Sequence, residues 1–219
     1  MRVADARAAI GDGTALVSVM HSNNETGVLQ PVEEIAAVAR TCGALVHTDA
    51  AQSAGKVHLD VRTLAIDLLS IAGHKLYAPK GVGALFVKRG TPLEPFMRGA
   101  RHERGLRPGT ENVASIVGLG RACELAVRDL ESVSGDLRRR RDSLWDRLQA
   151  GVPGIELNGH RMLRLPNTLN VRFPRVTGGA VLAAAPDVAA ATGSACHAGT
   201  AQASGVILAM GIEPEGALG

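Results

Sequence analysis

The feature that most constrains the fold is a regular alternation of short apolar runs with amphipathic stretches. Runs that are mainly apolar occupy residues 15–20, 44–47, 67–72 and 83–87. Residues 32–40 follow a proline and carry two glutamates in their first turn, which are start signals of a helix. Strands that alternate with helices are typical of a mainly parallel sheet with crossover helices. We therefore expect an α/β fold.

The second half of the chain has a different pattern. Apolar residues recur at helical spacing over 112–130 and again over 137–148, which predicts two helices. A Gly-Val-Pro-Gly break follows at 151–154, and beyond it we expect strands at 155–157, 168–173 and 187–191 and a helix at 204–210. We place a domain boundary near residue 130. Residues 1–130 would form a large domain, and residues 131–219 a small α+β domain.

Composition excludes several classes of protein. Hydrophobic residues make up 46% of the chain and charged residues 21%, as in an ordinary globular protein. The apolar runs are much shorter than the roughly 18 residues that a membrane span needs. Charged residues within the first twenty positions do not fit a signal peptide, so we expect a cytoplasmic protein without a membrane partner.

Charge gives no evidence for a nucleic-acid partner. The chain has 24 basic and 21 acidic residues, a net charge of +3. The run of four arginines at 138–141 is typical of a solvated helix face. We therefore expect no nucleic-acid binding.

Three cysteines, Cys42, Cys123 and Cys196, lie at wide and unrelated spacings. Such spacings predict neither a disulfide framework nor a metal site. Small residues surround Cys196 and His197 follows it, which favours an accessible thiolate that acts as a nucleophile. The alternative is an inert buried cysteine, which describes Cys42 and Cys123.

Polar residues follow the second predicted strand, where His47 and Asp49 precede Gln52. Ligands of open α/β sheets bind at the carboxyl ends of the strands. A carboxylate at that edge is suited to pair with a protonated ring nitrogen of a cofactor. The alternative is that Asp49 caps the next helix.

Lys75 follows the third predicted strand after Gly73 and His74. Apolar surroundings favour the neutral amine that a Schiff base requires. Gly81 and Gly83 would allow close approach of the backbone. The alternative is that Lys75, like Lys80, is an ordinary surface lysine.

Taken together, these motifs resemble those of group I cysteine desulfurases in the class V aminotransferase family, which also includes selenocysteine lyases. The matching segments occur in the family's order over nearly the whole chain: 21–27, 47–53, 73–75 with 79–81, 102–110, 166–170 and 193–197. The resemblance implies a fold type I transferase that depends on pyridoxal 5'-phosphate.

The resemblance also implies roles for particular residues. Lys75 would form the Schiff base with the cofactor, and Asp49 would keep the pyridine nitrogen protonated, so that the ring acts as an electron sink. Asn24 and Gln52 would bind near the phenolic oxygen.

The phosphate would have its own set of ligands. His74 would help to bind it, next to Gly73 and Ala72, and Ala72 stands where many desulfurases have a phosphate-contacting serine. Thr110 would reach the phosphate in the neighbouring subunit, which implies a homodimer.

The implied reaction begins with L-cysteine. The thiolate of Cys196 would attack the substrate sulfur, which leaves a persulfide on Cys196 and releases L-alanine. The sulfur would then pass to an acceptor protein, such as a scaffold for iron–sulfur cluster assembly.

Two alternatives stay open at this point. The segment 107–112 and His197 would also suit a selenocysteine lyase. The family's phosphate-binding turn and ring-stacking histidine are expected upstream of residue 1, and its substrate-carboxylate arginine downstream of residue 219. The chain would then be a fragment that lacks parts at both ends, and a catalytically silent fragment is the third reading.

Overall fold

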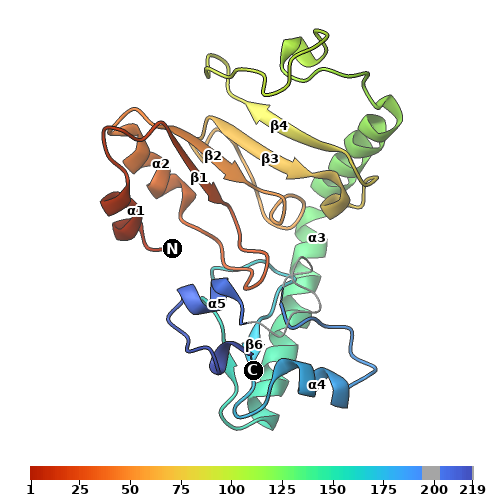
Figure 1. The fold of residues 1–219 in the computed structure, drawn as a ribbon. Helices are drawn as coiled ribbons and strands as arrows, with labels where there is room; N and C mark the ends of the chain where they lie inside the picture. Colours follow the sequence, from red (N-terminus) through yellow and green to blue (C-terminus); the bar gives the residue numbers. More distant parts are fainter. Residues whose placement is uncertain (194–202, 219) are drawn as a thin grey trace. The chain divides into compact units, whose positions relative to one another are not determined.

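The computed structural model describes residues 1–193 and 203–218. It divides into two compact units, which we call the first and the second unit. The first unit comprises Met1–His21 and Gln30–Glu131, and the second comprises Ser22–Leu29 and Ser132–Gly219. Figure 1 shows the helices and strands of both units.

The first unit is built on a four-stranded sheet with the strand order β1-β2-β3-β4. Its strands are β1 (Leu16–Met20), β2 (Leu45–Asp49), β3 (Leu68–Ala72) and β4 (Gly83–Val87). The first three are parallel, and β4 is antiparallel to β3. The four predicted strands and the mainly parallel α/β fold are thus confirmed. A short helix, α1 (Val3–Ala9), precedes the sheet.

Helix α2 (Val32–Arg40) covers one face of this sheet and coincides with the predicted helix. Its buried side chains pack with Val46 and Leu69 of the sheet. The register places Ser18, His47 and Asp49 on the opposite side of the pleat, because side chains alternate along a strand. These side chains are half-buried or exposed. The sheet therefore has one apolar face, and its opposite face carries polar side chains among apolar ones.

The prediction of two helices between 112 and 148 is wrong, because one helix, α3 (Val113–Gly151), runs through 39 residues. The side chain of Asn112 begins it by accepting a hydrogen bond from the Ser115 amide at 3.2 Å. No proline interrupts residues 131–136, and Gly135 is tolerated inside the helix. Gly151 and Pro153 coincide with its end.

The second unit contains a two-stranded antiparallel sheet of β5 (Glu156–Leu157) and β6 (Val171–Arg172). Short helices α4 (Gly178–Ala184) and α5 (Gly205–Ala209) and a 3₁₀ turn, η4 (Gly216–Leu218), follow. The strands expected at 155–157 and 168–173 are present in shorter form. The strand expected at 187–191 is wrong, since those residues are exposed and irregular. Four of the five are alanine or valine, which supply little apolar area to bury there.

Residues 22–29 lie in the second unit although they precede most of the first in sequence. The Leu29 amide donates to the Leu163 carbonyl at 3.0 Å, and the Leu165 amide donates to the Gly27 carbonyl at 2.8 Å. Backbone hydrogen bonds therefore tie this segment to residues 163–165. The sequence analysis places residues 22–29 in the domain 1–130, because no local sequence signal indicates pairing across more than 130 positions.

Candidate active site

Asp49 and Lys75 lie at the same edge of the parallel part of the sheet. Asp49 ends β2, opposite Ser70 of β3. The 3₁₀ turn η1 (Gly73–Leu76) begins directly after β3 and carries Lys75. Because β2 and β3 are parallel, their carboxyl ends share one edge. This is the edge at which the sequence predicted a ligand.

The carboxylate of Asp49 is exposed, and Oδ1 accepts a hydrogen bond from the Ala51 amide at 2.8 Å. This contact is an Asx turn, so the carboxylate shapes the turn after the strand rather than capping a helix. The Asp49 carbonyl accepts from the His21 amide at 2.8 Å. Gln52 lies half-buried in the same turn. The backbone carbonyl and the side chain of Asp49 thus each accept a hydrogen bond, and the carboxylate is still exposed to solvent.

The backbone around Lys75 is tightly fixed. The Gly73 amide donates to the Val82 carbonyl at 2.9 Å. A Cβ at residue 73 would lie 2.7 Å from that carbonyl oxygen, so only glycine fits there. Tyr77 ends the turn with φ of 63°, in the left-handed region. The side chains of His74 and Lys75 are nevertheless exposed, which leaves the Lys75 amine accessible on a rigid backbone.

A second lysine, Lys56, lies beside Lys75 and was missed by the sequence reasoning. Burial lowers the pKa of Lys56, and the positive charge of Lys75 lowers it further. The segment around Lys56 packs on η1, since a Cβ at Gly55 would lie 2.6 Å from Leu76 Cδ2. Two amines therefore share this part of the first unit, which favours anions there.

A row of polar side chains crosses the sheet next to Asp49. His47 Nδ1 lies 2.8 Å from Ser18 Oγ, and His47 Nε2 lies 3.2 Å from Ser70 Oγ. The imidazole thus connects β1, β2 and β3. The sequence pattern indicates His47 as a candidate residue but not its hydrogen-bond partners. The alternation of side chains along each strand was the available signal, because it puts Ser18 and His47 on one face.

His21, the first residue of the 21–27 motif, is buried in the first unit. Its Nδ1 lies 2.8 Å from Ser53 Oγ. Burial lowers the pKa of His21, so the neutral ring is favoured. The backbone amide of His21 also binds the Asp49 carbonyl, which helps to hold the turn after β2 in place.

The remaining predicted site residues lie in several places. Ala72 ends β3 opposite Gly83 of β4. Thr110 is exposed on the segment between the 3₁₀ turn η2 (Glu103–Gly105) and α3. That segment follows β4. Because β4 is antiparallel to β3, the segment begins at the end of the sheet opposite to the one that holds Asp49 and Lys75. Asn24 is exposed in the second unit. Cys196 lies outside the described residues.

The two other cysteines do not have the features of a nucleophile. Cys42 Sγ donates to the Ala39 carbonyl at 3.2 Å. Cys123 lies in α3, and burial raises its pKa, which disfavours the thiolate. Within 1–193 and 203–218, no group of three His, Cys, Asp or Glu side chains is placed to hold a metal ion. None of the helices in these ranges is long and apolar enough to cross a membrane.

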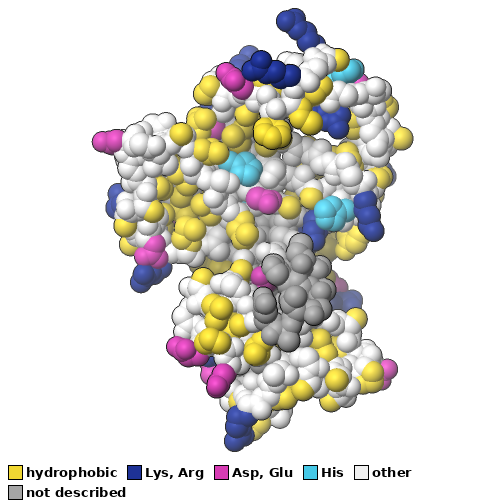
Figure 2. Space-filling view, viewed as in Figure 1, with side chains coloured by type: hydrophobic (Ala, Val, Ile, Leu, Met, Phe, Trp, Pro, Cys, Tyr) yellow, Lys and Arg dark blue, Asp and Glu magenta, His cyan; other side chains and the backbone are white. Residues whose placement is uncertain are grey.

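The first unit also exposes many apolar side chains around β4 and the start of α3. Phe96 is fully exposed, and Val113 and Val117 are about two-thirds exposed. Figure 2 shows hydrophobic side chains over the part of the molecule where Figure 1 places β4 and the segment after it. We call these exposed side chains together the β4 surface. Leu85 and Phe86 lie on opposite faces of β4, and the other members are Leu93, Phe96, Met97, Val113, Ile116 and Val117.

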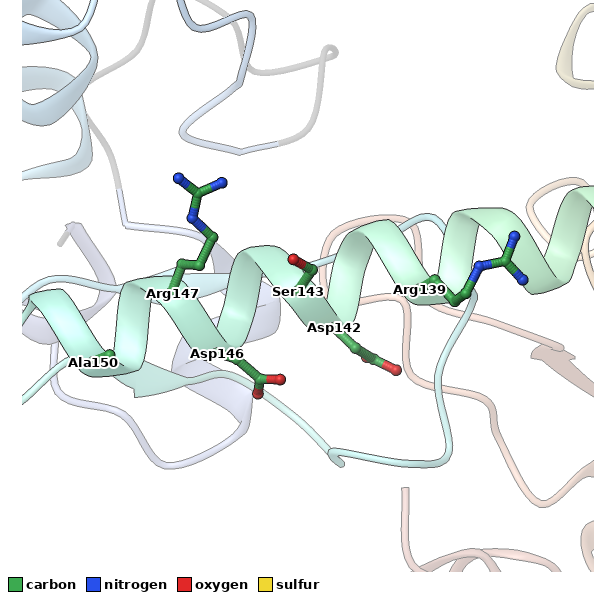
Figure 3. A pocket seen from close by; sticks show the side chains of 6 residues that line it. All are labelled: Arg139, Asp142, Ser143, Asp146, Arg147 and Ala150. Carbon is green, nitrogen blue, oxygen red and sulfur yellow. The ribbon is translucent and has the colours of Figure 1, made fainter.

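A hollow of about 560 Å³ lies along the second half of α3. Figure 3 shows that Asp142 and Asp146 leave the helix on one side, whereas Ser143 and Arg147 leave it on the other. Asp146 pairs with Arg161 at 3.6 Å. These polar groups do not converge on one point, so the hollow lacks the geometry of a catalytic site.

Comparison with known proteins gives a consistent result. The family model for aminotransferase class-V matches residues 1–211. Cysteine desulfurase 2 of Trichormus variabilis is 45% identical over 211 residues, which are 94% of this chain and 52% of that protein. The chain therefore spans about half the length of the curated relatives it matches.

Solved structures agree with the relatives. A NifS-like protein superposes with a TM-score of 0.86 at 33% identity, covering 100% of this chain and 57% of that one. A structure of SspA in complex with cysteine gives a TM-score of 0.80 at 33% identity and covers 99% of this chain and 60% of that one. Fold and site together define an α/β protein with a lysine and a carboxylate where the parallel strands of its sheet end. The chain belongs to the aminotransferase class-V family.

Proposed function

We propose that the chain carries the lysine and the cysteine nucleophile of a pyridoxal 5'-phosphate-dependent cysteine desulfurase. The observation that supports this most directly is the exposed Lys75 at the sheet edge that also holds Asp49. The relatives are named cysteine desulfurases, and the SspA structure contains cysteine. None of the reported relatives is named a selenocysteine lyase, so that alternative is not favoured.

The residues at the sheet edge fit this cofactor. An aldehyde needs an accessible amine, and Lys75 is exposed on a fixed turn. A pyridine nitrogen needs a carboxylate to keep it protonated, and the carboxylate of Asp49 is exposed beside that turn. A phosphate needs positive charge nearby, which Lys56 supplies. When bound, pyridoxal 5'-phosphate supplies the electron sink for negative charge at the substrate Cα.

Each of the chain's own groups would then bind a different part of the cofactor. Lys75 Nζ would attach the cofactor, and Asp49 would hold the proton on its ring nitrogen. By the family resemblance, Gln52 and Asn24 would each donate near the phenolic oxygen. His74, next to Ala72 and Gly73, would help to bind the phosphate. The half-buried ammonium of Lys56 strengthens the attraction for anionic groups.

The sulfur step belongs to Cys196. Its thiolate attacks the sulfur of L-cysteine: a sulfur–sulfur bond forms, the substrate carbon–sulfur bond breaks, and the carbon skeleton leaves as L-alanine after protonation. The persulfide is then passed to an acceptor protein, such as an iron–sulfur scaffold.

A homodimer is part of the proposal. The β4 surface is apolar and exposed, and β4 is an edge strand of its sheet. Exposed apolar patches of this kind mark protein–protein contacts. Thr110 follows on the same segment and would reach the phosphate held by the second copy.

The test is to mix the purified chain with pyridoxal 5'-phosphate, reduce it with borohydride and locate the pyridoxyl group by peptide mass spectrometry. We expect it on Lys75, lost in Lys75→Ala and retained in Lys80→Ala, which removes a neighbouring exposed lysine. L-cysteine with a thiol reductant should then give equal amounts of sulfide and alanine. Labelling scattered over surface lysines would contradict the cofactor site, and a bound cofactor without alanine would contradict the reaction.

A further inference from the structure

The turn at Ser22–Leu29 in the second unit is organised by one buried asparagine. Asn23 Oδ1 accepts from the amides of Glu25 at 3.0 Å and Thr26 at 2.8 Å. Gly27 has φ of 74°, and its amide donates to the Asn23 carbonyl at 3.0 Å. The backbone on both sides of Asn24 is therefore held in place, while the Asn24 side chain is exposed.

Glu25 connects this turn to two distant parts of the second unit. Its carbonyl accepts a hydrogen bond from Asn170 Nδ2 at 3.2 Å. Its side chain is half-buried, and Oε2 accepts a hydrogen bond from Ser204 Oγ at 2.5 Å. A hydroxyl that donates to a carboxylate makes one of the stronger hydrogen bonds in proteins. Glu25 is thus bound at both its backbone and its side chain.

Ser204 uses its hydroxyl fully. It is the N-cap of α5, and Oγ accepts from the amides of Val206 at 3.1 Å and Ile207 at 3.4 Å while it donates to Glu25. Ile207 is buried and anchors the same helix. In sequence, Ser204 follows Cys196 by eight positions. The start of α5 is therefore a fixed point in the chain close behind the proposed nucleophile.

We propose that Glu25 is a positioning residue for sulfur transfer, which acts through Ser204. The Glu25–Ser204 hydrogen bond fixes the start of α5, which follows Cys196 by eight positions in the sequence, to the turn that carries Asn24. Asn24 and the start of α5 are thereby joined by one hydrogen-bonded frame within the second unit. This inference rests on the proposed function and adds a residue that the reaction needs without touching substrate.

The decisive variants are Glu25→Ala and Ser204→Ala. Each should slow persulfide formation on Cys196 about tenfold in a single turnover, as expected for a lost hydrogen bond to a charged group. Affinity for pyridoxal 5'-phosphate and for L-alanine should stay unchanged, so kcat falls while KM does not. Ser204→Thr keeps the hydroxyl and should restore the rate. Glu25→Gln keeps an acceptor and should have a smaller effect.

The double variant tests whether the two residues act as one. If they do, Glu25→Ala with Ser204→Ala should be no slower than either single variant. Thr177→Ala is the matched control, because Thr177 caps α4 in the same unit by accepting from the Ala180 amide at 3.3 Å. Loss of a cap there should leave the persulfide rate unchanged.

A readout without cofactor completes the test. Amide hydrogen exchange of Gly205–Ala209 should rise in Glu25→Ala and in Ser204→Ala, but not in Thr177→Ala. Additive effects, an equal effect of Thr177→Ala, or a parallel loss of cofactor affinity would overturn the positioning role. If the unsubstituted chain forms no persulfide, the proposed function fails together with this role. If it does form and the variants match it, only the role of Glu25 fails.

Discussion

At the scale of single residues, burial shifts the pKa of several ionisable groups in the first unit. Burial lowers the pKa of His21 and of Lys56 and raises that of Cys123. Each shift favours the uncharged form, as expected when a group leaves water. Asp49, His74 and Lys75, by contrast, have exposed side chains that can meet a ligand.

The neutral His21 should make stability depend on pH. Its pKa is below the ordinary value of 6.5 when folded, so the unfolded chain binds the proton more tightly. The contribution of the neutral ring is complete above about pH 6.5 and is lost as the pH falls below that value. We expect the melting temperature to fall between pH 7.5 and 5.5, and His21→Gln to reduce the slope.

The matched control is His58→Gln, because His58 is exposed in the same unit. Its melting temperature should follow the unsubstituted chain over the whole pH range. Equal slopes for His21→Gln and the unsubstituted chain would mean that burial of His21 does not govern this dependence.

Some of these residues were predictable and others were not. Asp49 and Lys75 could be placed at one edge, because parallel strands end together and both residues follow short apolar runs. The contact of Glu25 with Ser204 joins positions 179 apart. The contacts of His47 depend on the register of three strands. Pattern along the chain does not encode such pairings.

At the scale of elements, local sequence signals were sufficient to predict a helix or strand wherever a turn or cap bounded a short segment. Helix α2 begins after Pro31 as predicted, and four strands have the predicted places. The continuity of α3 was missed because polar residues around 131–136 weaken the helical pattern without breaking the backbone. The false strand at 187–191 is rich in alanine, for which periodicity carries little information.

Gly135 gives a direct test of the continuous helix. A Cβ there meets only Arg139 Nη1 at 3.6 Å, an ordinary contact. Gly135→Ala should stabilise the chain by up to about 1 kcal/mol. Gly135→Pro should cost about 3 kcal/mol or more, since proline removes a helical hydrogen bond and clashes with the preceding turn. Urea unfolding followed by circular dichroism measures both. A proline variant as stable as the unsubstituted chain would mean that the helix is interrupted there.

At the scale of the whole molecule, the β4 surface exposes apolar side chains that a second copy would cover in the proposed homodimer. If it joins two copies, Phe96→Glu should raise the dimer dissociation constant at least tenfold, as expected at a buried aromatic anchor. Sedimentation velocity at several concentrations measures this. Val188→Glu is the control, because Val188 is 58% exposed in the second unit and lies outside the β4 surface. A chain that is monomeric at every concentration would contradict the dimer.

The two contacts of the His47 imidazole determine which of its ring nitrogens can carry the hydrogen. Both of its neighbours are hydroxyls, and a hydroxyl can donate or accept by turning its hydrogen. The ring can therefore carry its hydrogen on either nitrogen and keep both contacts. A carboxylate in place of either serine would select one tautomer. Nitrogen chemical shifts of this ring would then separate into protonated and unprotonated values that the natural pair of serines averages.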